Sequence, residues 1–367
     1  MKFSPGKRRG LLFSAGIVVY SLYAGRVSLR ALRLWVPGAS GWVFWPLWLL
    51  PGAALLSVSF LPRGHLKGIC RRVGELWQSL ATYPFGLIGL AGIISALAAA
   101  LGHPLPFRET ALAVLEGSLL LLLLSVPGAL WPRTVRYTVH LPGLEEDLRA
   151  VVVSDFHLGF FTPRALLRRL ADMVSREAPD LVLIPGDIFD EEYTALRHPR
   201  KAEEALRAMT GRLGNFACEG NHDNYAPSPQ AEDFCRRAGI RMLRDAWADA
   251  GPLRVGGRLD KRRPKRMGEA DFLTLAGDGR PRVVLDHDPS AGERLVKAGA
   301  GLVLSGHTHG GQTFPLNLLG RLLPYPIYGR RDFPDGCQIV TAGVGIWGFP
   351  LRLGVRSEIA VVELRGE

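Results

Sequence analysis

Acidic and imidazole side chains follow apolar runs in the second half of the chain. Val151–Val153 precedes Asp155 and His157, and Leu181–Ile184 precedes Asp187. Short β-branched and aliphatic runs of this kind predict buried strands. In open α/β sheets, ligands bind outside the carboxyl ends of the strands. These three side chains are therefore predicted to lie at a functional site.

The same arrangement recurs three more times towards the carboxyl terminus. Asn215–Cys218 precedes Asn221-His222-Asp223, Val283–Leu285 precedes His287, and Leu302–Leu304 precedes His307 and His309. Glycines stand beside four of the five clusters, where they allow a sharp turn and a close approach of the backbone to a ligand. The collected candidates are Asp155, His157, Asp187, Asn221, His222, His287, His307 and His309.

The donor types in this set indicate a metal centre. Oxygen and imidazole ligands without a thiolate favour Mn²⁺, Fe or Zn²⁺, and do not suit Ca²⁺ or an iron–sulfur cluster. Eight candidates exceed what one ion needs, so two divalent ions are the simpler prediction. Two ions about 3.5–4 Å apart can hold the attacking and leaving oxygens of an in-line displacement.

The order of the blocks resembles the calcineurin-like metallophosphoesterases, whose motifs are D-x-H, G-D, G-N-H-[DE], a lone His and G-H-x-H. All five blocks are present in order. The resemblance covers about residues 147–364 and implies a four-layer α/β/β/α sandwich with two mixed sheets. It also implies hydrolysis of a phosphate ester.

The resemblance further implies a role for each residue. Asp155, His157 and His309 bind the first metal, Asn221, His287 and His307 bind the second, and Asp187 bridges the two. A bridging hydroxide attacks phosphorus. His222 contacts the substrate and protonates the leaving oxygen, and Asp223 orients His222.

The elements that position these residues can also be predicted. The expected strands are Thr134–Leu141, Val151–Val153, Leu181–Ile184, Asn215–Cys218, Ile240–Leu243, Leu253–Val255, Val283–Leu285, Leu302–Leu304, Gln338–Thr341 and Glu358–Leu364. The expected helices are Pro163–Arg176, Ala202–Met209 and Pro229–Ala238. Residues 133–367 are therefore predicted to form the catalytic domain.

Residues 1–132 have the composition of a membrane domain. The apolar runs Leu11–Ala24, Ala39–Leu61, Thr82–Leu101 and Thr110–Trp131 predict about four spans, and the last three reach the length of about 20 residues that a spanning helix needs. The first run is short enough for a signal-peptide core, but it lacks a clear small-residue cleavage site. Lys and Arg in the amino-terminal tail and the second loop predict a cytoplasmic catalytic domain.

The overall charge restricts the class of partner. The formal net charge is +11, which suits anionic partners. No nucleic-acid-binding motif is present, so a phosphate group or a lipid surface is the predicted partner. The four cysteines form no C-x-x-C pair and are predicted to be reduced.

Three stretches of the sequence bear on the natural substrate. The stretches Leu285–Pro289, Gly310–Gln312 and Gly343–Arg352 resemble a membrane-anchored branch of the family. That branch includes proteins likened to a UDP-2,3-diacylglucosamine hydrolase of lipid A synthesis. The resemblance implies a phosphodiester or pyrophosphate bond in a lipid-linked nucleotide sugar. The alternatives are a phosphomonoesterase acting on proteins or small metabolites, and a metal-binding membrane scaffold without activity.

Several charged segments have two interpretations. The basic run Lys261–Arg266 is either a solvated loop or a contact for anionic lipid. The segment Pro324–Gly336 either lines a substrate pocket, with Tyr328 and Arg330 contacting the substrate, or forms an ordinary hairpin. Asp288 either orients His287 or begins a turn at Pro289.

Two acidic sites are assigned no ligand role. Asp190, Glu191 and Glu192 are predicted to start a helix or loop. Glu116 lies within an apolar run, where it either has a function in the membrane or reaches the headgroups.

Overall fold

The structure is a computed structural model. It describes residues 5–58, 60–61, 65–190, 193–225, 228–277, 279–346, 348 and 351–366. The chain divides into two compact units, Met1–Leu124 and Ser125–Glu367.

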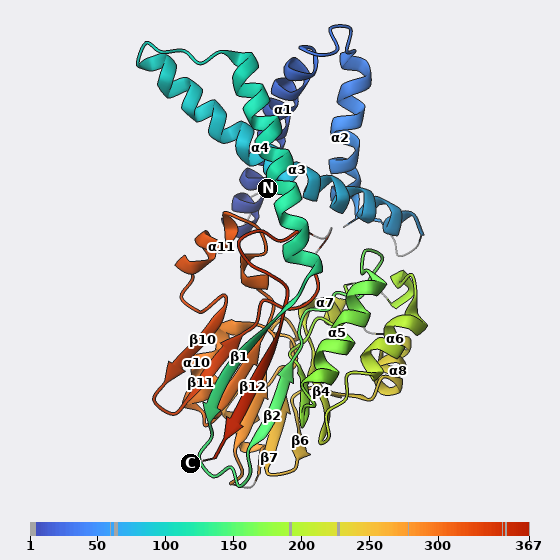
Figure 1. The fold of residues 1–367 in the computed structure, drawn as a ribbon, viewed down its shortest axis with the longest axis vertical. Coiled ribbons are helices and arrows are strands. Elements are labelled where there is room, and N and C mark those ends of the chain that lie inside the picture. Colours follow the sequence, from blue (N-terminus) through green and yellow to red (C-terminus); the bar gives the residue numbers. More distant parts are fainter. Residues whose placement is uncertain are drawn as a thin grey trace. The chain divides into compact units, whose positions relative to one another are not determined.

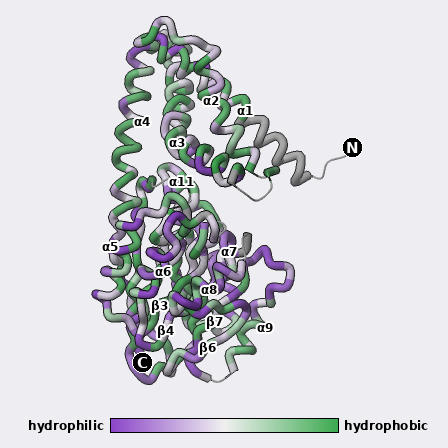
Figure 2. Tube along the Cα trace, turned by 90° about the vertical axis from the view of Figure 1, so that its right-hand side faces the viewer, coloured by the Kyte–Doolittle hydropathy of each residue, from purple (hydrophilic) through white to green (hydrophobic). Residues whose placement is uncertain are grey.

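The first unit is helical in its described part. Its elements are α1 (Pro5–Leu32), α2 (Gly41–Ser57), α3 (His65–Ala100) and the greater part of α4 (Phe107–Leu130) (Figure 1). Apolar residues cover α2 and α4 on most sides (Figure 2). The first turns of α3 also carry Arg71, Arg72 and Glu75, and the rest of α3 is mostly apolar. Helices that are apolar all round are either buried or surrounded by lipid.

Two helices in the described part of the chain are long and apolar enough to cross a bilayer. They are Leu66–Ala100 and Phe107–Leu130. The helix Gly41–Ser57 is apolar but has 17 residues, because it ends before the predicted run does. The prediction of four spans is therefore not confirmed, and two candidate spans are present among the described residues.

The second unit contains two mixed six-stranded sheets, counted over its described residues. The first has the order β1 (Arg133–His140), β12 (Glu358–Arg365), β2 (Leu148–Val152), β3 (Leu181–Ile184), β4 (Gly214–Cys218) and β5 (Ile240–Leu243). The second has the order β10 (Gly329–Phe333), β11 (Gly336–Val340), β9 (Leu302–Ser305), β8 (Arg282–Leu285), β7 (Leu253–Gly257) and β6 (Ala246–Ala250).

Three apolar clusters separate four layers. Side chains alternate between the two faces of a strand. On β2 and just after it, Val151 and Val153 therefore pack against the helices α5 (Arg164–Arg176), α6 (Pro199–Arg207) and α8 (Pro229–Arg237). Ala150 and Val152 point into the cluster between the sheets. A third cluster joins the second sheet to α9 (Glu269–Thr274) and α10 (Gly292–Lys297). The predicted α/β fold with two mixed sheets is confirmed.

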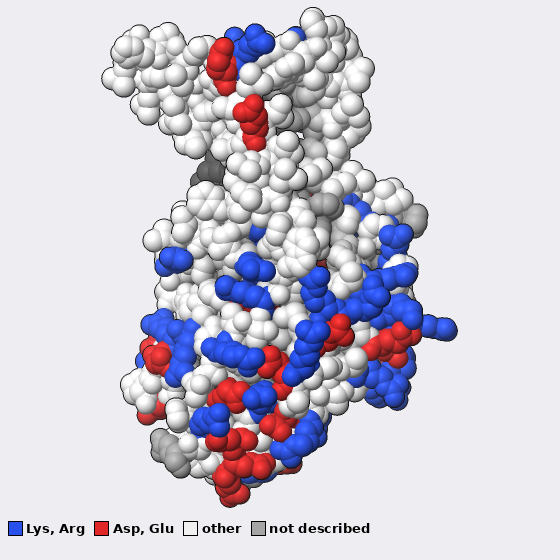
Figure 3. Space-filling model, in the orientation of Figure 1, with Lys and Arg blue, Asp and Glu red and all other residues white. Residues whose placement is uncertain are grey.

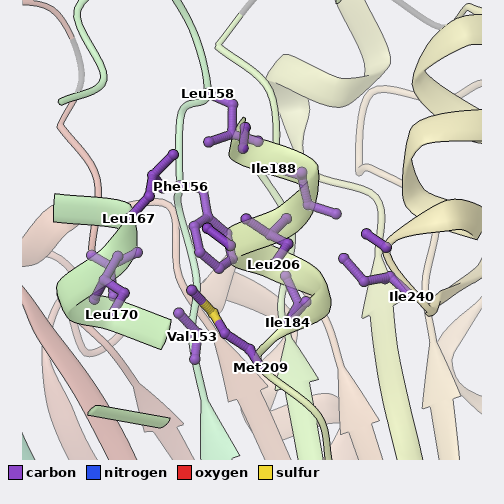
Figure 4. Packing of buried hydrophobic residues seen from close by; sticks show 14 of the residues in the cluster. Val153, Phe156, Leu158, Leu167, Leu170, Ile184, Ile188, Leu206, Met209 and Ile240 are labelled. Carbon is purple, nitrogen blue, oxygen red and sulfur yellow. The ribbon is translucent and has the colours of Figure 1, made fainter. Parts of the chain in front are cut away.

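The helix-side cluster supports the loops that carry the candidate site. Figure 4 shows Val153, Phe156 and Ile184 between the strands and the helices. On α5, Leu166, Leu170 and Val174 are buried at helical spacing. Full burial of one such side chain contributes about 1.5–3 kcal/mol. The strand ends are therefore held by a packed core.

The sequence did not reveal two edge strands. β6 and β10 alternate poorly in hydrophobicity, and three of the five residues of β10 are exposed. β10 pairs antiparallel with β11, so residues 329–340 form the hairpin alternative proposed for this segment. The strand predicted as Val151–Val153 ends at Val152, because Val153 already belongs to the loop that follows.

Candidate metal centre

The predicted ligands converge on one region of the second unit. β2, β3 and β4 are parallel neighbours in one sheet, and β8 and β9 are parallel neighbours in the other. Their carboxyl ends bring together three groups in which the ligand atoms lie within 4.8 Å of one another. The groups are Asp155 with His157 and His309, His157 with Asp187 and His222, and Asp187 with His287 and His307.

The first group is nearly closed to solvent. The Nε2 atoms of His157 and His309 lie 3.0 Å apart. His309 Nε2 is also 3.6 Å from Asp155 Oδ1. Two facing imidazole nitrogens share one proton at most, whereas both can bind one cation. This arrangement therefore fits a shared metal ion.

Asp187 lies between the two halves of the centre. Its Oδ2 atom is 3.7 Å from His157 Nε2 and 3.0 Å from His287 Nε2. Burial alone raises the pKa of this carboxyl, but the charges of His287 and His157 hold the pKa below its ordinary value. Asp187 thus carries a negative charge at the position expected for a bridging ligand.

The backbone fixes the orientation of His287. Its Nδ1 atom donates to the carbonyl oxygen of Pro185 at 2.8 Å, so Nε2 is directed at Asp187. Metal-binding histidines commonly use one nitrogen in this way. Burial lowers the pKa of His287, but the Asp187 carboxylate raises it to about 10.

Two buried oxygen atoms of the candidate ligands have no hydrogen-bond partner among the described residues. They are Asp155 Oδ2 and Asn221 Oδ1. Asn221 begins the short helix α7 (Asn221–Tyr225) and is buried. Buried polar atoms are normally satisfied, so an unsatisfied pair in a ligand cluster requires an explanation. A pair of divalent cations would supply it, and the residues present fit such a pair.

The backbone at the centre is unusual. Five of the candidates have positive φ angles, namely Asp155, His157, Asp187, His307 and His309. Side-chain-bearing residues rarely adopt this conformation, and where they do it concentrates at functional sites. At Gly220 a Cβ atom would lie 2.1 Å from Asp187 Oδ1, and at Gly306 one would lie 2.2 Å from Asp155 Oδ2. Both positions therefore require glycine.

The partner of His222 differs from the predicted one. Its Nδ1 atom lies 2.7 Å from the carbonyl oxygen of Asp190 and 3.4 Å from Asp190 Oδ1. Burial lowers the pKa of His222, but the hydrogen bond to Asp190 and the charge of Asp187 raise it to about 9. Asp190, which the sequence analysis placed at a loop start, therefore orients the imidazole. Glu191 and Glu192 lie outside the described residues.

The carboxylate of Asp223 makes backbone contacts that the sequence did not predict. Its carboxylate accepts hydrogen bonds from the backbone N–H groups of Ile188, Phe189 and Gly220 at 3.3, 3.0 and 3.0 Å. These bonds join the loop after β3 to the turn after β4. Asp223 thus holds two candidate ligand-bearing loops together, and its orienting role for His222 stays a prediction.

Tyr328 and Arg330 bind other parts of the protein. The Tyr328 hydroxyl donates to Glu358 Oε2 at 2.9 Å. Arg330 donates to Asp332 Oδ1 at 2.7 Å and to the carbonyl oxygen of Thr138. The structure does not bring either side chain to the ligand cluster, so their role as substrate contacts stays a prediction.

The basic run Lys261–Arg266, which we call the basic loop, is not a freely solvated loop, and its contact with anionic lipid stays a prediction. Arg263 contacts Glu219 Oε1 and Oε2 at 2.6 and 2.9 Å. Arg266 contacts Asp286 at 2.5 Å, and Lys261 pairs with Asp288.

These carboxylates lie next to candidate metal ligands. Glu219 precedes Asn221 by two residues, and Asp286 and Asp288 flank His287. Asp288 also accepts from the backbone N–H of Ser290 at 3.0 Å, so it begins the turn at Pro289, as one of its two interpretations proposed. The basic loop thus anchors the second half of the centre.

Arg352 is a further neighbour of the candidate ligands, and the sequence gives no signal for it. Arg352 is fully buried, and its Nη2 atom lies 3.1 Å from His309 Nδ1 and 2.6 Å from the carbonyl oxygen of Gly345. Arg352 lies 43 residues after His309 in the chain, so no local sequence pattern indicates that the two side chains meet. Trp347, Phe349 and Pro350 of the same stretch lie outside the described residues.

Several known proteins are similar in sequence to this chain. The family model described as Calcineurin-like phosphoesterase matches residues 148–311. An uncharacterised metallophosphoesterase of Campylobacter jejuni is 30% identical over 266 residues, which cover 71% of this chain and 70% of that protein. The chain belongs to the calcineurin-like metallophosphoesterase family.

The names of two further relatives mention a membrane location and an activity. A transmembrane protein with metallophosphoesterase domain from Danio rerio is 32% identical over 279 residues, covering 71% of this chain. The chain spans 63% of the length of that protein. The phosphodiesterase YaeI of Escherichia coli is 29% identical over 237 residues, covering 59% of this chain and 82% of that protein.

Proposed function

We propose that the chain is a membrane-anchored phosphoesterase that uses two divalent ions to hydrolyse a phosphodiester or pyrophosphate bond. The observation that carries the proposal is the position of Asp187, which belongs to two of the three ligand groups. A carboxylate shared in this way is the feature that distinguishes a two-metal centre from two separate sites.

Each ion would be held by residues from both sheets. Asp155, His157 and His309 would bind one ion, and Asn221, His287 and His307 the other, with Asp187 common to both. When bound, the ions would lower the pKa of water and neutralise charge on the phosphoryl oxygens. We propose Mn²⁺ as the bound metal, with Fe and Zn²⁺ as alternatives.

The remaining chemistry falls to the protein's own side chains. A carbonyl oxygen only accepts, so His222 presents a protonated Nδ1 to Asp190. The other ring nitrogen, Nε2, then serves as the proton donor to the leaving oxygen. The high pKa of His222 keeps the imidazole protonated near neutral pH, which a general acid requires.

A lipid-linked substrate suits an enzyme with candidate spanning helices. The names of the relatives from Danio rerio and Escherichia coli support a transmembrane protein and a phosphodiesterase activity. We propose a nucleotide-linked glycolipid of the UDP-2,3-diacylglucosamine type as the substrate, and a cytoplasmic position for the catalytic unit. The cytoplasmic position rests on the basic residues of the amino-terminal tail and of the second loop.

Purified full-length protein tests the activity directly. With Mn²⁺ supplied, we expect faster hydrolysis of bis-(p-nitrophenyl) phosphate than of p-nitrophenyl phosphate, and loss of both activities in Asp187→Asn. The reverse preference would favour the phosphomonoesterase alternative. No hydrolysis of either ester would favour the metal-binding scaffold. Mass spectrometry of lipid extracts incubated with the protein then identifies the natural substrate.

A further inference from the structure

An exposed apolar segment directly follows the last ligand block. We call residues 313–324 the apolar loop; it contains α11 (Leu316–Leu319). Leu322 is 83% exposed and Phe314 is 45% exposed. Leu316, Leu318, Leu319 and Leu323 are exposed as well. A contiguous group of large apolar side chains on a surface indicates a binding site.

The end of a candidate spanning helix lies in the same unit. The last turns of α4, from Ser125 onwards, belong to the catalytic unit. Arg352 N donates to the carbonyl oxygen of Ser125 at 2.9 Å, and Ser357 N donates to that of Gly128 at 2.8 Å. A Cβ atom at Gly128 would lie 2.5 Å from the Arg352 carbonyl oxygen. The helix end is therefore closely docked on residues 352–357.

Residues 352–357 also contact the apolar loop and the turn before it. Leu353 N donates to the carbonyl oxygen of Gln312 at 3.0 Å. A Cβ atom at Gly354 would lie 2.3 Å from the Asn317 side chain. The apolar loop and the end of α4 are thus joined by one short segment, and Figure 1 places α11 at the end of the unit where β1 begins.

The end of α4 carries features of a bilayer surface. Trp131 is 47% exposed, and the Arg169 guanidinium lies 5.9 Å from the centre of its ring. Arg356 donates to the Trp131 carbonyl oxygen at 3.0 Å. Trp and Arg concentrate where spanning helices leave the hydrocarbon. In Figure 3 this end of the unit shows few acidic residues, which gather at the opposite end.

We propose that the apolar loop inserts into the lipid bilayer in which α4 is anchored. The spanning helix brings the membrane surface to this end of the unit, and the exposed Leu and Phe side chains enter the boundary between headgroups and acyl chains. Arg321, exposed within the loop, is placed to meet anionic headgroups. Because His309 precedes the loop by four residues, the candidate centre is held close to the lipid.

Site-specific fluorescence tests the insertion without relying on activity. The full-length chain carries Cys70→Ser, which removes the one cysteine that is not fully buried, together with Leu322→Cys labelled with an NBD fluorophore. The protein is reconstituted into vesicles of phosphatidylcholine and phosphatidylglycerol. The matched control is Asp233→Cys, an exposed position on α8.

Insertion predicts a blue-shifted emission at position 322 and about a twofold loss of emission when doxyl-labelled lipids are included. Position 233 should show neither effect. Equal quenching of both labels by aqueous iodide would overturn the proposal. A blue shift at 322 without quenching by the lipids would also overturn it, and would indicate a protein partner such as a second copy. Leu319→Cys provides a second position in the same loop.

Discussion

The imidazole of His222 is oriented by Asp190, although Asp223 is its neighbour in the chain. The two groups meet at 2.7 Å between His222 Nδ1 and the Asp190 carbonyl oxygen. Asp190 Oδ1 also lies 3.2 Å from His157 Nδ1. One residue therefore positions both the proposed proton donor and a proposed metal ligand.

Asp190→Asn should lower kcat by about tenfold, since it removes the charge but keeps the backbone carbonyl that His222 uses. Loss of that charge also lowers the pKa of His222, so the basic limb of the pH–rate profile should move to lower pH. Steady-state kinetics between pH 6 and 10 measure both effects, with metal content determined alongside. An unchanged kcat with an unchanged profile would contradict the positioning role.

His222→Ala should lower kcat by about 100-fold or more, because a general acid contributes about 10²–10⁴ to the rate. The bound metal should be retained, since the ligands of both proposed ions remain. Elemental analysis of the purified variant distinguishes loss of chemistry from loss of metal. Full activity in this variant would remove His222 from the mechanism.

Asp223→Ala should act mainly on stability. Three backbone N–H groups lose their acceptor, and each buried unsatisfied group costs about 1–3 kcal/mol. Chemical denaturation in detergent measures the change in the free energy of unfolding. The conservative variant Asp223→Asn keeps one oxygen acceptor, so its loss should be smaller. Equal stability of wild type and Asp223→Ala would refute this assignment.

Protons and metal ions should compete at His287. Its pKa is about 10 in the metal-free protein, above its value of about 6.5 in an unfolded chain. Protonated His287 therefore stabilises the metal-free protein fully below about pH 6.5, and this contribution is lost as the pH rises through about 10.

A metal ion needs the neutral imidazole. We expect the Tm of EDTA-treated protein to fall from pH 6.5 to 10, and the rise in Tm on adding Mn²⁺ to grow over the same range. Thermal scans with and without Mn²⁺ at each pH test this. A Mn²⁺ effect that is independent of pH would show that His287 is not a ligand.

Arg263→Ala should destabilise the protein by about 1–3 kcal/mol, because the buried Glu219 carboxylate loses the guanidinium that donates to both of its oxygens. Arg244, 3.7 Å from Glu219, compensates only part of the charge. The matched control is Lys265→Ala, an exposed position of the same basic loop, which should change stability by less than about 0.5 kcal/mol. Equal effects of the two substitutions would rule out an anchoring role for the loop.

Several strands of the catalytic unit, including those before candidate ligands, could be predicted from the sequence. β3 and β5 have the bounds that their apolar runs predicted, and β8 and β9 differ from them by one residue. Short aliphatic runs ending in polar residues and glycine are local signals, so they can be read without knowing the neighbours of a strand. The motif order then indicated the family and the ligand types.

Which loops meet depends on the packing of the two sheets and is not encoded locally. In the folded chain His222 contacts Asp190, and the Asp223 carboxylate accepts hydrogen bonds from three backbone N–H groups. The tertiary structure also turned the basic loop towards Glu219 and Asp286, where the sequence suggested only solvent or lipid. A carboxylate binds whichever donor the packing of the sheets brings within about 3 Å, and that distance depends on residues far apart in the chain.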